Sequence, residues 1–195
     1  DELKQLKKFS EFAKKNNLII DTSEYLHQEL KAGKRLLAEG ANGAMLDIDH
    51  GTYPFVTSST TTSGGICTGL GIPPTSIETI VGTVKAYTTR VGSGPFPTEL
   101  TNDLGEKIRQ IGQEVGVTTG RPRRCGWFDL NVLRKSCRLN GYTSILVTKL
   151  DILSNLGDLQ VLLDKGEYKT LKGWEEDISR ARTFDQLPKN AQKYI

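Results

Sequence analysis

Residues 39–68 read EGANGAMLDIDHGTYPFVTSSTTTSGGICT, and the expectations for the rest of the chain start from this stretch. It is rich in glycine and hydroxyl side chains, and its residues 57–65 include no apolar side chain. Because such a run can bury little, we do not expect it to form part of a core. Hydroxyl groups and a closely approaching glycine backbone are suited to a polar ligand. A flexible Ser/Thr linker is the alternative, although residues 36–38 and 66–67 are apolar, as flanking ordered elements would be.

The composition is that of a globular protein of moderate charge. A chain of 195 residues is long enough for one substantial core or two small lobes. The net charge is +3, and Lys and Arg are dispersed except at Arg121, Arg123 and Arg124. This pattern argues against a nucleic-acid-binding groove but allows a local anion site. No apolar run approaches the roughly 18 residues of a membrane span, so we expect no membrane partner either.

Cysteine usage indicates a reducing compartment, which we take to be the cytoplasm. Cys67, Cys125 and Cys137 are odd in number and have neither CxxC nor His/Cys spacing. We therefore expect no disulfide framework and no zinc site. The chain has no initiator Met and no signal peptide, and it opens on the charged, helical residues 1–9. We expect it to be the interior of a longer protein.

The first forty residues predict two helices and two strands. Apolar residues at helical spacing predict an amphipathic helix over residues 2–15, and a second helix is predicted over 22–32. Residues 18–21 are short, apolar and β-prone. Residues 34–39 are predicted to form a buried strand.

Further along, the elements alternate between loops, helices and strands. Residues 77–87 are apolar and β-branched and fit either a helix or a strand. Two Gly and two Pro predict a loop over residues 88–97. Helices are predicted over 104–115 and 129–139, and a strand over 142–147.

Several polar residues stand around the predicted strand 34–39. Asn42 follows its carboxyl end, where ligands gather in open parallel sheets, and its amide can both donate and accept. A turn asparagine between two glycines is the alternative. Asp47, Asp49 and His50 raise the question of catalysis or metal binding, because alternate residues of a strand share one face.

Residues 117–124 read VTTGRPRR and place three guanidinium groups within four residues. Such groups repel one another unless they are solvated or face an anion. The forked guanidinium fits carboxylate and phosphate, Pro122 stiffens the spacing, and the Thr hydroxyls add donors. An anion-binding loop is the prediction, and a solvated basic turn is the alternative.

Residues 148–151 read TKLD and follow the predicted strand 142–147. A carboxylate at Asp151 can accept from both N1–H and the 2-amino group of guanine, while the Lys149 stem can lie along the base. TKxD is a short, weak motif by itself. The alternative is that Asp151 caps a helix beginning near Ile152.

Long blocks of the sequence resemble the adenylosuccinate synthetase family. They are EGANGAMLDIDHGTYPFVTSS at 39–59 followed by TTSGG at 61–65, VGSGPFPTEL at 91–100, VTTGRPRRCGW at 117–127, TKLD at 148–151, LKGWEEDISRAR at 171–182 and LPKNAQKYI at 187–195. They lie in the family's order and cover most of the chain.

The resemblance implies an α/β fold of the P-loop-NTPase-like adenylosuccinate synthetase type, with a mostly parallel sheet flanked by helices. It implies one domain over residues 1–195, incomplete at both ends. The implied activity is that of a ligase that uses GTP to join L-aspartate to IMP. The products are adenylosuccinate, GDP and phosphate, in the first committed step of AMP synthesis from IMP. The family is a homodimer.

The resemblance also implies roles for particular residues. It assigns IMP binding to Asn42, Thr57 and Arg121. It assigns aspartate binding to Val117, Thr118, Thr119, Gly120, Arg121, Pro122 and Arg123. It assigns GTP binding to Arg123, Lys149, Leu150 and Asp151.

The chain departs from the family pattern at the front, where no phosphate loop occurs. The family's catalytic Asp and His and its Mg²⁺ ligands belong there, so we expect no catalytic and no metal-binding residue in this chain, and no activity of this segment alone. We accordingly interpret Asp47 and Asp49 as structural anchors of the loop and His50 as a neighbour of the site. The stretch after Val161 is shorter than in the family, and the final family block is missing. A catalytically silent purine-nucleotide-binding module is the alternative.

Overall fold

Parallel strand pairs form the framework of the computed structural model, which describes residues 1–116 and 120–195. Strand β1 (Val81–Lys85) lies parallel to β5 (Ser144–Thr148). The stretch 77–87, which fitted either a helix or a strand, therefore contains a strand. The strand predicted over 142–147 is confirmed as β5. Helices accompany these strands, which confirms the α/β class.

Antiparallel pairs accompany these parallel ones. Strand β2 (Thr88–Arg90) pairs with β3 (Arg124–Gly126), so the stretch predicted as a loop begins with a short strand. In a separate three-stranded sheet, β6 (Leu159–Leu162) lies between β4 (Phe128–Asp129), to which it is parallel, and β7 (Tyr168–Leu171), to which it is antiparallel. The short stretch after Val161 is thus a hairpin.

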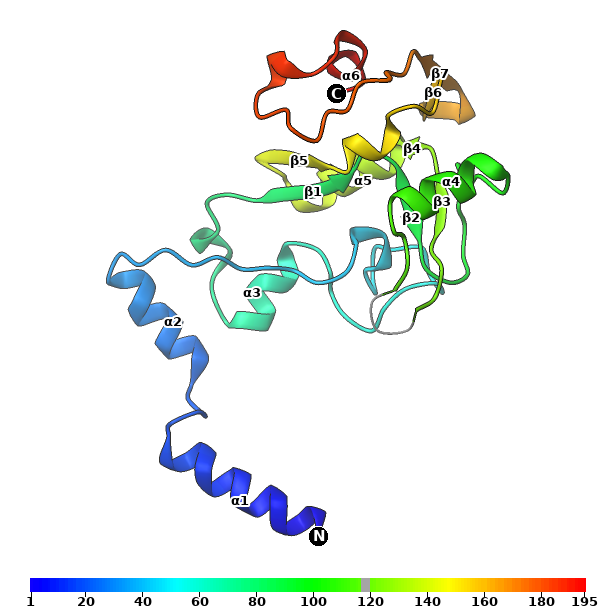
Figure 1. Cartoon of the computed structure of the whole chain (residues 1–195). Helices are drawn as coiled ribbons and strands as arrows, with labels where there is room; N and C mark the ends of the chain where they lie inside the picture. Colours follow the sequence, from blue (N-terminus) through cyan, green and yellow to red (C-terminus); the bar gives the residue numbers. More distant parts are fainter. Residues whose placement is uncertain (117–119) are drawn as a thin grey trace.

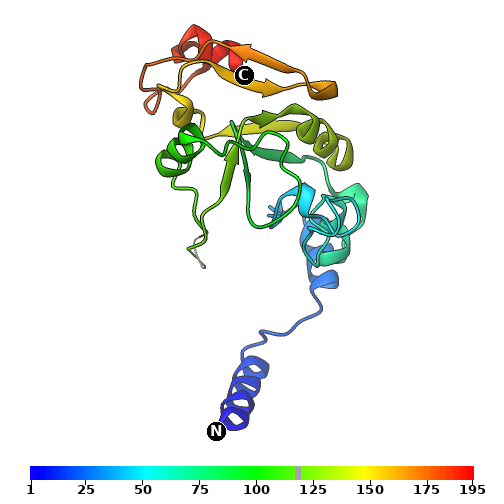
Figure 2. The same cartoon turned by 90° about the vertical axis from the view of Figure 1, so that its right-hand side faces the viewer.

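The α-helices of the described residues are α1 (Glu2–Lys15), α2 (Thr22–Lys31), α3 (Gly64–Leu70), α4 (Asp103–Ile111), α5 (Leu130–Asn140) and α6 (Lys189–Tyr194). Short 3-10 turns include η1 (Ala44–Leu46) and η3 (Leu150–Leu153). Two views show the β1–β5 pair in the middle of the body, with α3 and η1 on one side and the C-terminal segment with α6 on the other (Figures 1 and 2).

The core lies between α4, η3 and the C-terminal segment. Its buried members include Ile108, Leu153, Leu159 and Trp174. The indole of Trp174 packs edge-on against the ring of Tyr194, with ring centroids 6.0 Å apart. The blocks of sequence after residue 150 therefore close the core over the strands.

Helix α1 extends away from the body as an arm, whereas α2 touches the body where the Ser23 hydroxyl donates to the carbonyl of Gly71 after α3 (Figures 1 and 2). The helix predicted over residues 2–15 is confirmed, but the strands predicted at 18–21 and 34–39 are wrong. Leu37 is 98% exposed, and no strand among the described residues lies beside it for pairing. A strand without a partner leaves its backbone hydrogen bonds unmade, so high β propensity alone does not form one.

Helix α4 ends four residues earlier than its predicted end at residue 115. Gly112 follows the last turn, and Gln113 then adopts a left-handed conformation with φ of +50°. The chain leaves the helix axis at that point. Glu114, which the helical pattern placed on α4, lies instead on the loop toward β3.

Candidate functional site

The Asp47 carboxylate organises the loop that opens the glycine- and hydroxyl-rich stretch. Asp47 is fully buried. Its Oδ1 accepts the backbone N–H groups of Asp49 (3.0 Å) and His50 (2.9 Å). Its Oδ2 accepts those of Thr61 (2.8 Å) and Thr62 (3.4 Å). The prediction that Asp47 is a structural anchor is confirmed.

Asp49 and His50 do not share that role. Both residues are exposed, and no hydrogen bond of the Asp49 carboxylate occurs in the described part of the chain. Asp49 contributes its backbone N–H to Asp47 and leaves its own side chain in solvent. The interpretation of Asp49 as a second anchor is therefore wrong.

Residues 57–65 are tied to their surroundings at both ends, unlike a flexible linker. The N–H of Thr57 donates to the carbonyl of Leu46 at 2.8 Å. Ser63 donates its N–H to Oδ1 of Asn140 (2.7 Å) and its hydroxyl to the Asn140 carbonyl (3.1 Å). Because Asn140 is the last residue of α5, this helix fixes the far end of the run.

The two residues predicted to bind IMP from this stretch lie on its surface side. Asn42 is exposed and left-handed, with φ of +62°, in a turn rather than at the end of a strand. Thr57 is half-buried. Asn42 is therefore accessible, and Thr57 partly so, beside a loop whose backbone Asp47 holds in place.

Arg90 connects this loop to β2. Its Nη2 donates to the hydroxyl of Thr52 (3.0 Å) and to the carbonyl of Phe55 (3.2 Å), and its Nε donates to the carbonyl of Ser93 (3.0 Å). One guanidinium thus joins residues 52–55 to the loop after β2. Because β2 pairs with β3, Arg90 links the Asp47 loop to the sheet that carries Arg124.

Arg124, the third arginine of that cluster, is committed to structure. It forms a two-pronged ion pair with Glu99, with Nε–Oε1 at 2.7 Å and Nη2–Oε2 at 2.5 Å. Its Nη1 also donates to the carbonyls of Gly92 and Gly94. The hydrogen bonds from Arg124 are the main cause that lowers the pKa of Glu99.

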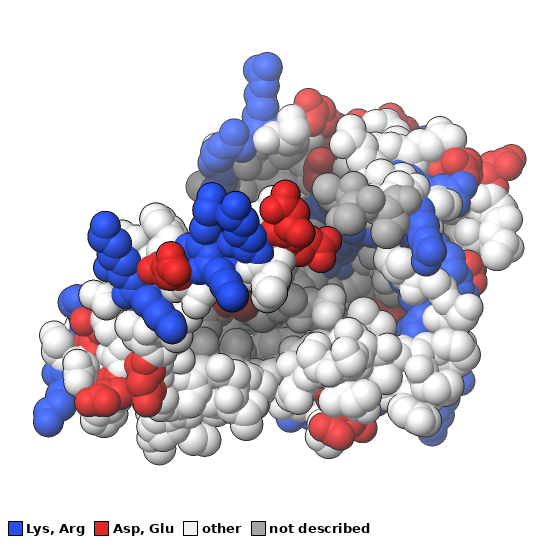
Figure 3. Space-filling model, turned by 90° about the horizontal axis from the view of Figure 1, so that it is seen from below, with Lys and Arg blue, Asp and Glu red and all other residues white. Residues whose placement is uncertain are grey.

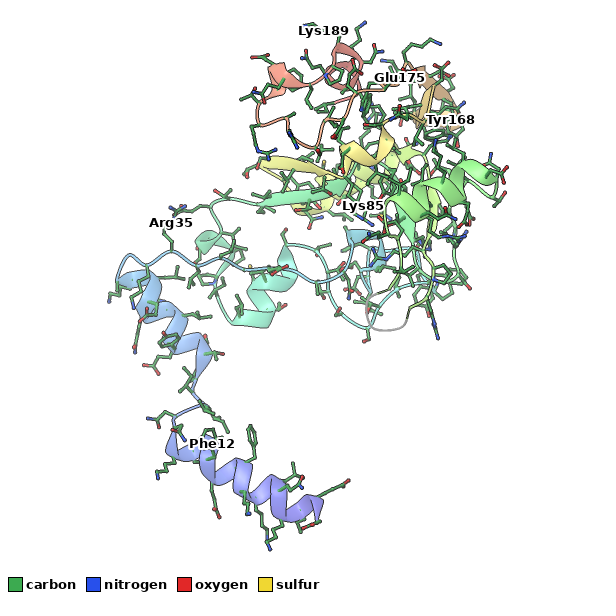
Figure 4. All side chains as sticks on the ribbon, viewed as in Figure 1. Phe12, Arg35, Lys85, Tyr168, Glu175 and Lys189 are labelled. Atoms are coloured by element: carbon green, nitrogen blue, oxygen red, sulfur yellow. The ribbon has the colours of Figure 1, made fainter. Side chains whose placement is uncertain are left out.

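Glu114 is the centre of the site, and its carboxylate is fully buried. Oε1 accepts from the Tyr87 hydroxyl (2.6 Å) and the Lys149 ammonium (3.0 Å). Oε2 accepts from Nη1 of Arg123 at 2.8 Å. Lys85 donates to both oxygens, at 2.8 and 2.7 Å. Figure 4 shows Lys85 at the carboxyl end of β1.

This cluster, called the Glu114 cluster below, carries three cations against one carboxylate. Burial opposes ionisation of Glu114, but hydrogen bonds from Lys85, Tyr87, Lys149 and Arg123 outweigh it and lower its pKa to about 2. Burial is also the main cause that lowers the pKa of Lys85 and raises the pKa of Tyr87. The excess positive charge suits an anionic ligand.

The residues predicted to bind guanine have different surroundings. Lys149 is left-handed, with φ of +57°, and its ammonium also donates to the carbonyl of Gly112 at 2.5 Å. Leu150 packs against the core. Asp151 is exposed and lies inside η3. The N-cap position of η3 is occupied by Lys149, so the helix-cap alternative for Asp151 is wrong.

The arginine-rich loop is described only in part. Val117, Thr118 and Thr119, all predicted to bind aspartate, lie outside the described residues. Gly120, Arg121 and Pro122 are exposed. Arg123, by contrast, is held by Glu114 and brought next to Lys149, so the two predicted motifs meet at one carboxylate.

Sequence reasoning missed Glu114, Lys85 and Tyr87. A signal was present for the first of them. Glu114 is the only carboxylate between Glu106 and Asp129, and it stands just before a run of arginines. A lone acid in a basic stretch is a candidate for a buried counter-charge.

Other kinds of site are not seen in residues 1–116 and 120–195. No helix there is long and apolar enough to cross a bilayer. No group of three or more His, Cys, Asp or Glu side chains there is placed to hold a metal ion.

The face seen from below carries basic and acidic side chains side by side (Figure 3).

Comparisons with known proteins all lead to one family. The model of the family described as adenylosuccinate synthetase matches residues 1–164. Adenylosuccinate synthetases of Paramecium tetraurelia and Scheffersomyces stipitis are each 50% identical over 100% of this chain and 50% of their own length. One of Geobacter sulfurreducens is 52% identical over 92% of this chain and 46% of its own. The chain thus spans about half the length of these relatives.

A solved structure gives the same result for the fold. The fully ligated adenylosuccinate synthetase from Plasmodium falciparum matches with a TM-score of 0.93 at 44% identity, over 100% of this chain and 52% of that one. The Paramecium alignment covers 215 positions against 195 residues here, so that relative has insertions relative to this chain. The chain belongs to the adenylosuccinate synthetase family.

Proposed function

We propose that this chain is a substrate-binding part of an enzyme that joins L-aspartate to IMP at the expense of GTP, forming adenylosuccinate, GDP and phosphate. The observation that carries the proposal is the Glu114 cluster. It holds Arg123, from the predicted aspartate loop, and Lys149, from the predicted guanine element, on opposite oxygens of one carboxylate. In a family of this activity, that arrangement places an anion-binding and a base-binding group side by side.

The three substrates meet overlapping sets of residues. IMP is held by Asn42, Thr57 and Arg121. The aspartate carboxylates meet the loop 117–123, and its Arg123 also reaches GTP. The guanine base meets Lys149, Leu150 and Asp151. The exposed Asp151 carboxylate, an acceptor only, matches the two donors N1–H and 2-NH₂ of guanine.

Several further features are proposed for the complete protein. Residues 1–195 are part of a single domain that extends beyond them, and the protein is a cytoplasmic homodimer. Mg²⁺ accompanies GTP. Among the described residues, no group of three or more His, Cys, Asp or Glu side chains is placed to hold a metal ion. Its ligands and the catalytic residues are therefore sought in the parts of the relatives that this chain does not cover.

Turnover tests the activity directly. The full-length protein, given IMP, GTP, L-aspartate and Mg²⁺, is expected to form adenylosuccinate, whereas residues 1–195 alone are expected to form none. Nucleotide binding without turnover by the full-length protein would instead support the silent module.

A substitution at Asp151 tests the guanine assignment. Asp151→Asn presents one donor and one acceptor, which suits the 2-oxo group of xanthine and opposes the 2-amino group of guanine. The ratio of kcat/KM for GTP over XTP should fall, by as much as roughly 10⁴-fold in favourable cases. Asp158→Asn is the matched control, because Asp158 is paired with Lys172 at the surface. An unchanged ratio in Asp151→Asn would remove Asp151 from the guanine site.

A further inference from the structure

We propose that Glu114 is a positioning residue that couples the guanine site to the aspartate-binding loop. The inference rests on the proposed function and deepens it. Glu114 touches no substrate in this role; it sets where Arg123 and Lys149 lie relative to each other.

The two oxygens of the Glu114 carboxylate bind residues of different proposed sites, the guanine site and the aspartate-binding loop. Lys149 is bound at Oε1 (3.0 Å) and Arg123 at Oε2 (2.8 Å). Lys85 bridges both oxygens, and Tyr87 adds a bond of 2.6 Å to Oε1. The orientation of Glu114 is therefore fixed by β1 and the residues after it, and Arg123 and Lys149 take their positions from it.

Glu114 differs in solvent exposure from the two cations that it binds. The Glu114 side chain is 0% exposed, whereas those of Arg123 and Lys149 are 30% and 35% exposed. Each cation is thus fixed from the buried side while part of it still faces outward, where a ligand can meet it. A buried group that fixes two partly exposed ones is the arrangement expected of pre-organised binding residues.

The shared carboxylate makes the two sites interdependent. An anion that draws Arg123 away from Oε2 leaves more of the Glu114 charge to Lys85 and Lys149, and a ligand that moves Lys149 acts on Arg123 in the same way. Binding couplings of this kind are reciprocal. GTP and aspartate are therefore predicted to respond together to a change at Glu114, and IMP to respond less.

The test is Glu114→Gln in the full-length protein, with KM measured separately for GTP, aspartate and IMP. The KM values for GTP and aspartate should each rise about tenfold, and that for IMP should stay within about twofold. Glu99→Gln is the matched control, because Glu99 pairs with the neighbouring Arg124 but has no contact with Lys149. In this control the ratios among the three KM values should stay within about twofold of the wild type.

A uniform rise of all three KM values in Glu114→Gln, or the same GTP effect in Glu99→Gln, would overturn the inference. If Glu114→Gln does not fold, Glu114→Asp keeps the charge and shortens its reach. It must then show the same split between GTP or aspartate and IMP, and a uniform change would again overturn the inference. Failure of the proposed function is separate, since it would appear as absent turnover in the wild type.

Discussion

Asp47 and Glu114 are both fully buried carboxylates, and they are stabilised in opposite ways. Asp47 accepts four backbone N–H groups, all from residues 49–62 of its own loop. Glu114 accepts only side-chain donors, three of them cationic, which come from β1, the residue before β3 and the residue after β5.

The kind of donor determines what each carboxylate can control. Peptide N–H groups are neutral and fixed by the backbone, so Asp47 stabilises a loop conformation and leaves nearby side chains free. Cationic side chains are mobile and carry the charge that a ligand meets, so Glu114 controls binding groups directly. Asp47 therefore fixes the backbone of the loop, and Glu114 fixes the positions of cationic side chains.

The largest expected effect is that of Glu114→Ala on stability. Removing the acceptor leaves three cations and the Tyr87 hydroxyl without their common partner, and breaking a buried ion pair in this way costs roughly 3–5 kcal/mol. Urea denaturation at neutral pH measures the loss. Glu99→Ala breaks a partly exposed ion pair, whose side chains are 25% and 30% exposed, and should cost less than Glu114→Ala. Equal losses in the two variants would place Glu114 among ordinary surface ion pairs.

Acid should remove the same stabilisation without a mutation. The pKa of Glu114 is about 2 in the folded protein, below its ordinary value of 4.5. Because the folded pKa is the lower one, its stabilisation is complete above about pH 4.5 and is lost as the pH falls toward about 2. The full contribution is roughly 3 kcal/mol.

Glu114→Gln provides the comparison, since Gln resembles the protonated carboxyl. The difference in unfolding free energy between wild type and this variant should be nearly constant from about pH 7 to 5 and should shrink below about pH 4.5. Urea denaturation at a series of pH values measures it. A difference that persists undiminished at about pH 3 would contradict the assigned pKa direction.

Asp47→Asn should have a smaller, local effect. One amide oxygen replaces two carboxylate oxygens, so the new NH₂ group faces two backbone donors, and the expected loss is about 1–3 kcal/mol. Hydrogen exchange should speed up at one pair of amides, either Asp49 and His50 or Thr61 and Thr62, depending on which pair the new NH₂ group faces. Asp49→Asn, at an exposed side chain, should change stability by less than about 0.5 kcal/mol. A similar loss in both variants would mean that the loop does not depend on Asp47.

The same difference explains how far the sequence could be interpreted. The donors of Asp47 lie within fifteen residues of it, and an acidic residue in a Gly- and Ser-rich stretch is typical of a turn anchor, so its role was predictable. Glu114 draws on Lys85 and Lys149, which are 29 and 35 residues away. A pattern read along the chain assigned it to a helix, because only the fold brings those donors together.

The predicted strand at 34–39 failed for a related reason. Its sequence has the propensity, but a strand is stabilised by hydrogen bonds to a neighbour, and the described residues offer none. The strand at 142–147 had comparable local signals and formed as β5, because β1 lies beside it. Pairing, which the sequence does not display, separates the two outcomes.

The smallest expected effect comes from removing a single hydroxyl group near each carboxylate. Such a change separates the two, because Asp47 accepts from backbone N–H groups and Glu114 accepts from side chains. Thr61→Val keeps the backbone N–H that lies 2.8 Å from Oδ2 of Asp47 and removes only the hydroxyl bond to the Gly43 carbonyl. The expected loss in unfolding free energy is about 0.5–1.5 kcal/mol. Tyr87→Phe, in contrast, removes a donor 2.6 Å from the ionised Glu114, and bonds to charged groups contribute roughly 1.5–3 kcal/mol.

Urea denaturation of both variants under one condition makes the comparison quantitative. The Tyr87→Phe loss should exceed the Thr61→Val loss, since only the former takes a hydrogen bond from a buried charge. The exchange of the Thr61 amide should also stay slow in Thr61→Val, because its acceptor is intact. A larger loss in Thr61→Val, with fast exchange at that amide, would show that side-chain hydroxyls rather than Asp47 hold the loop.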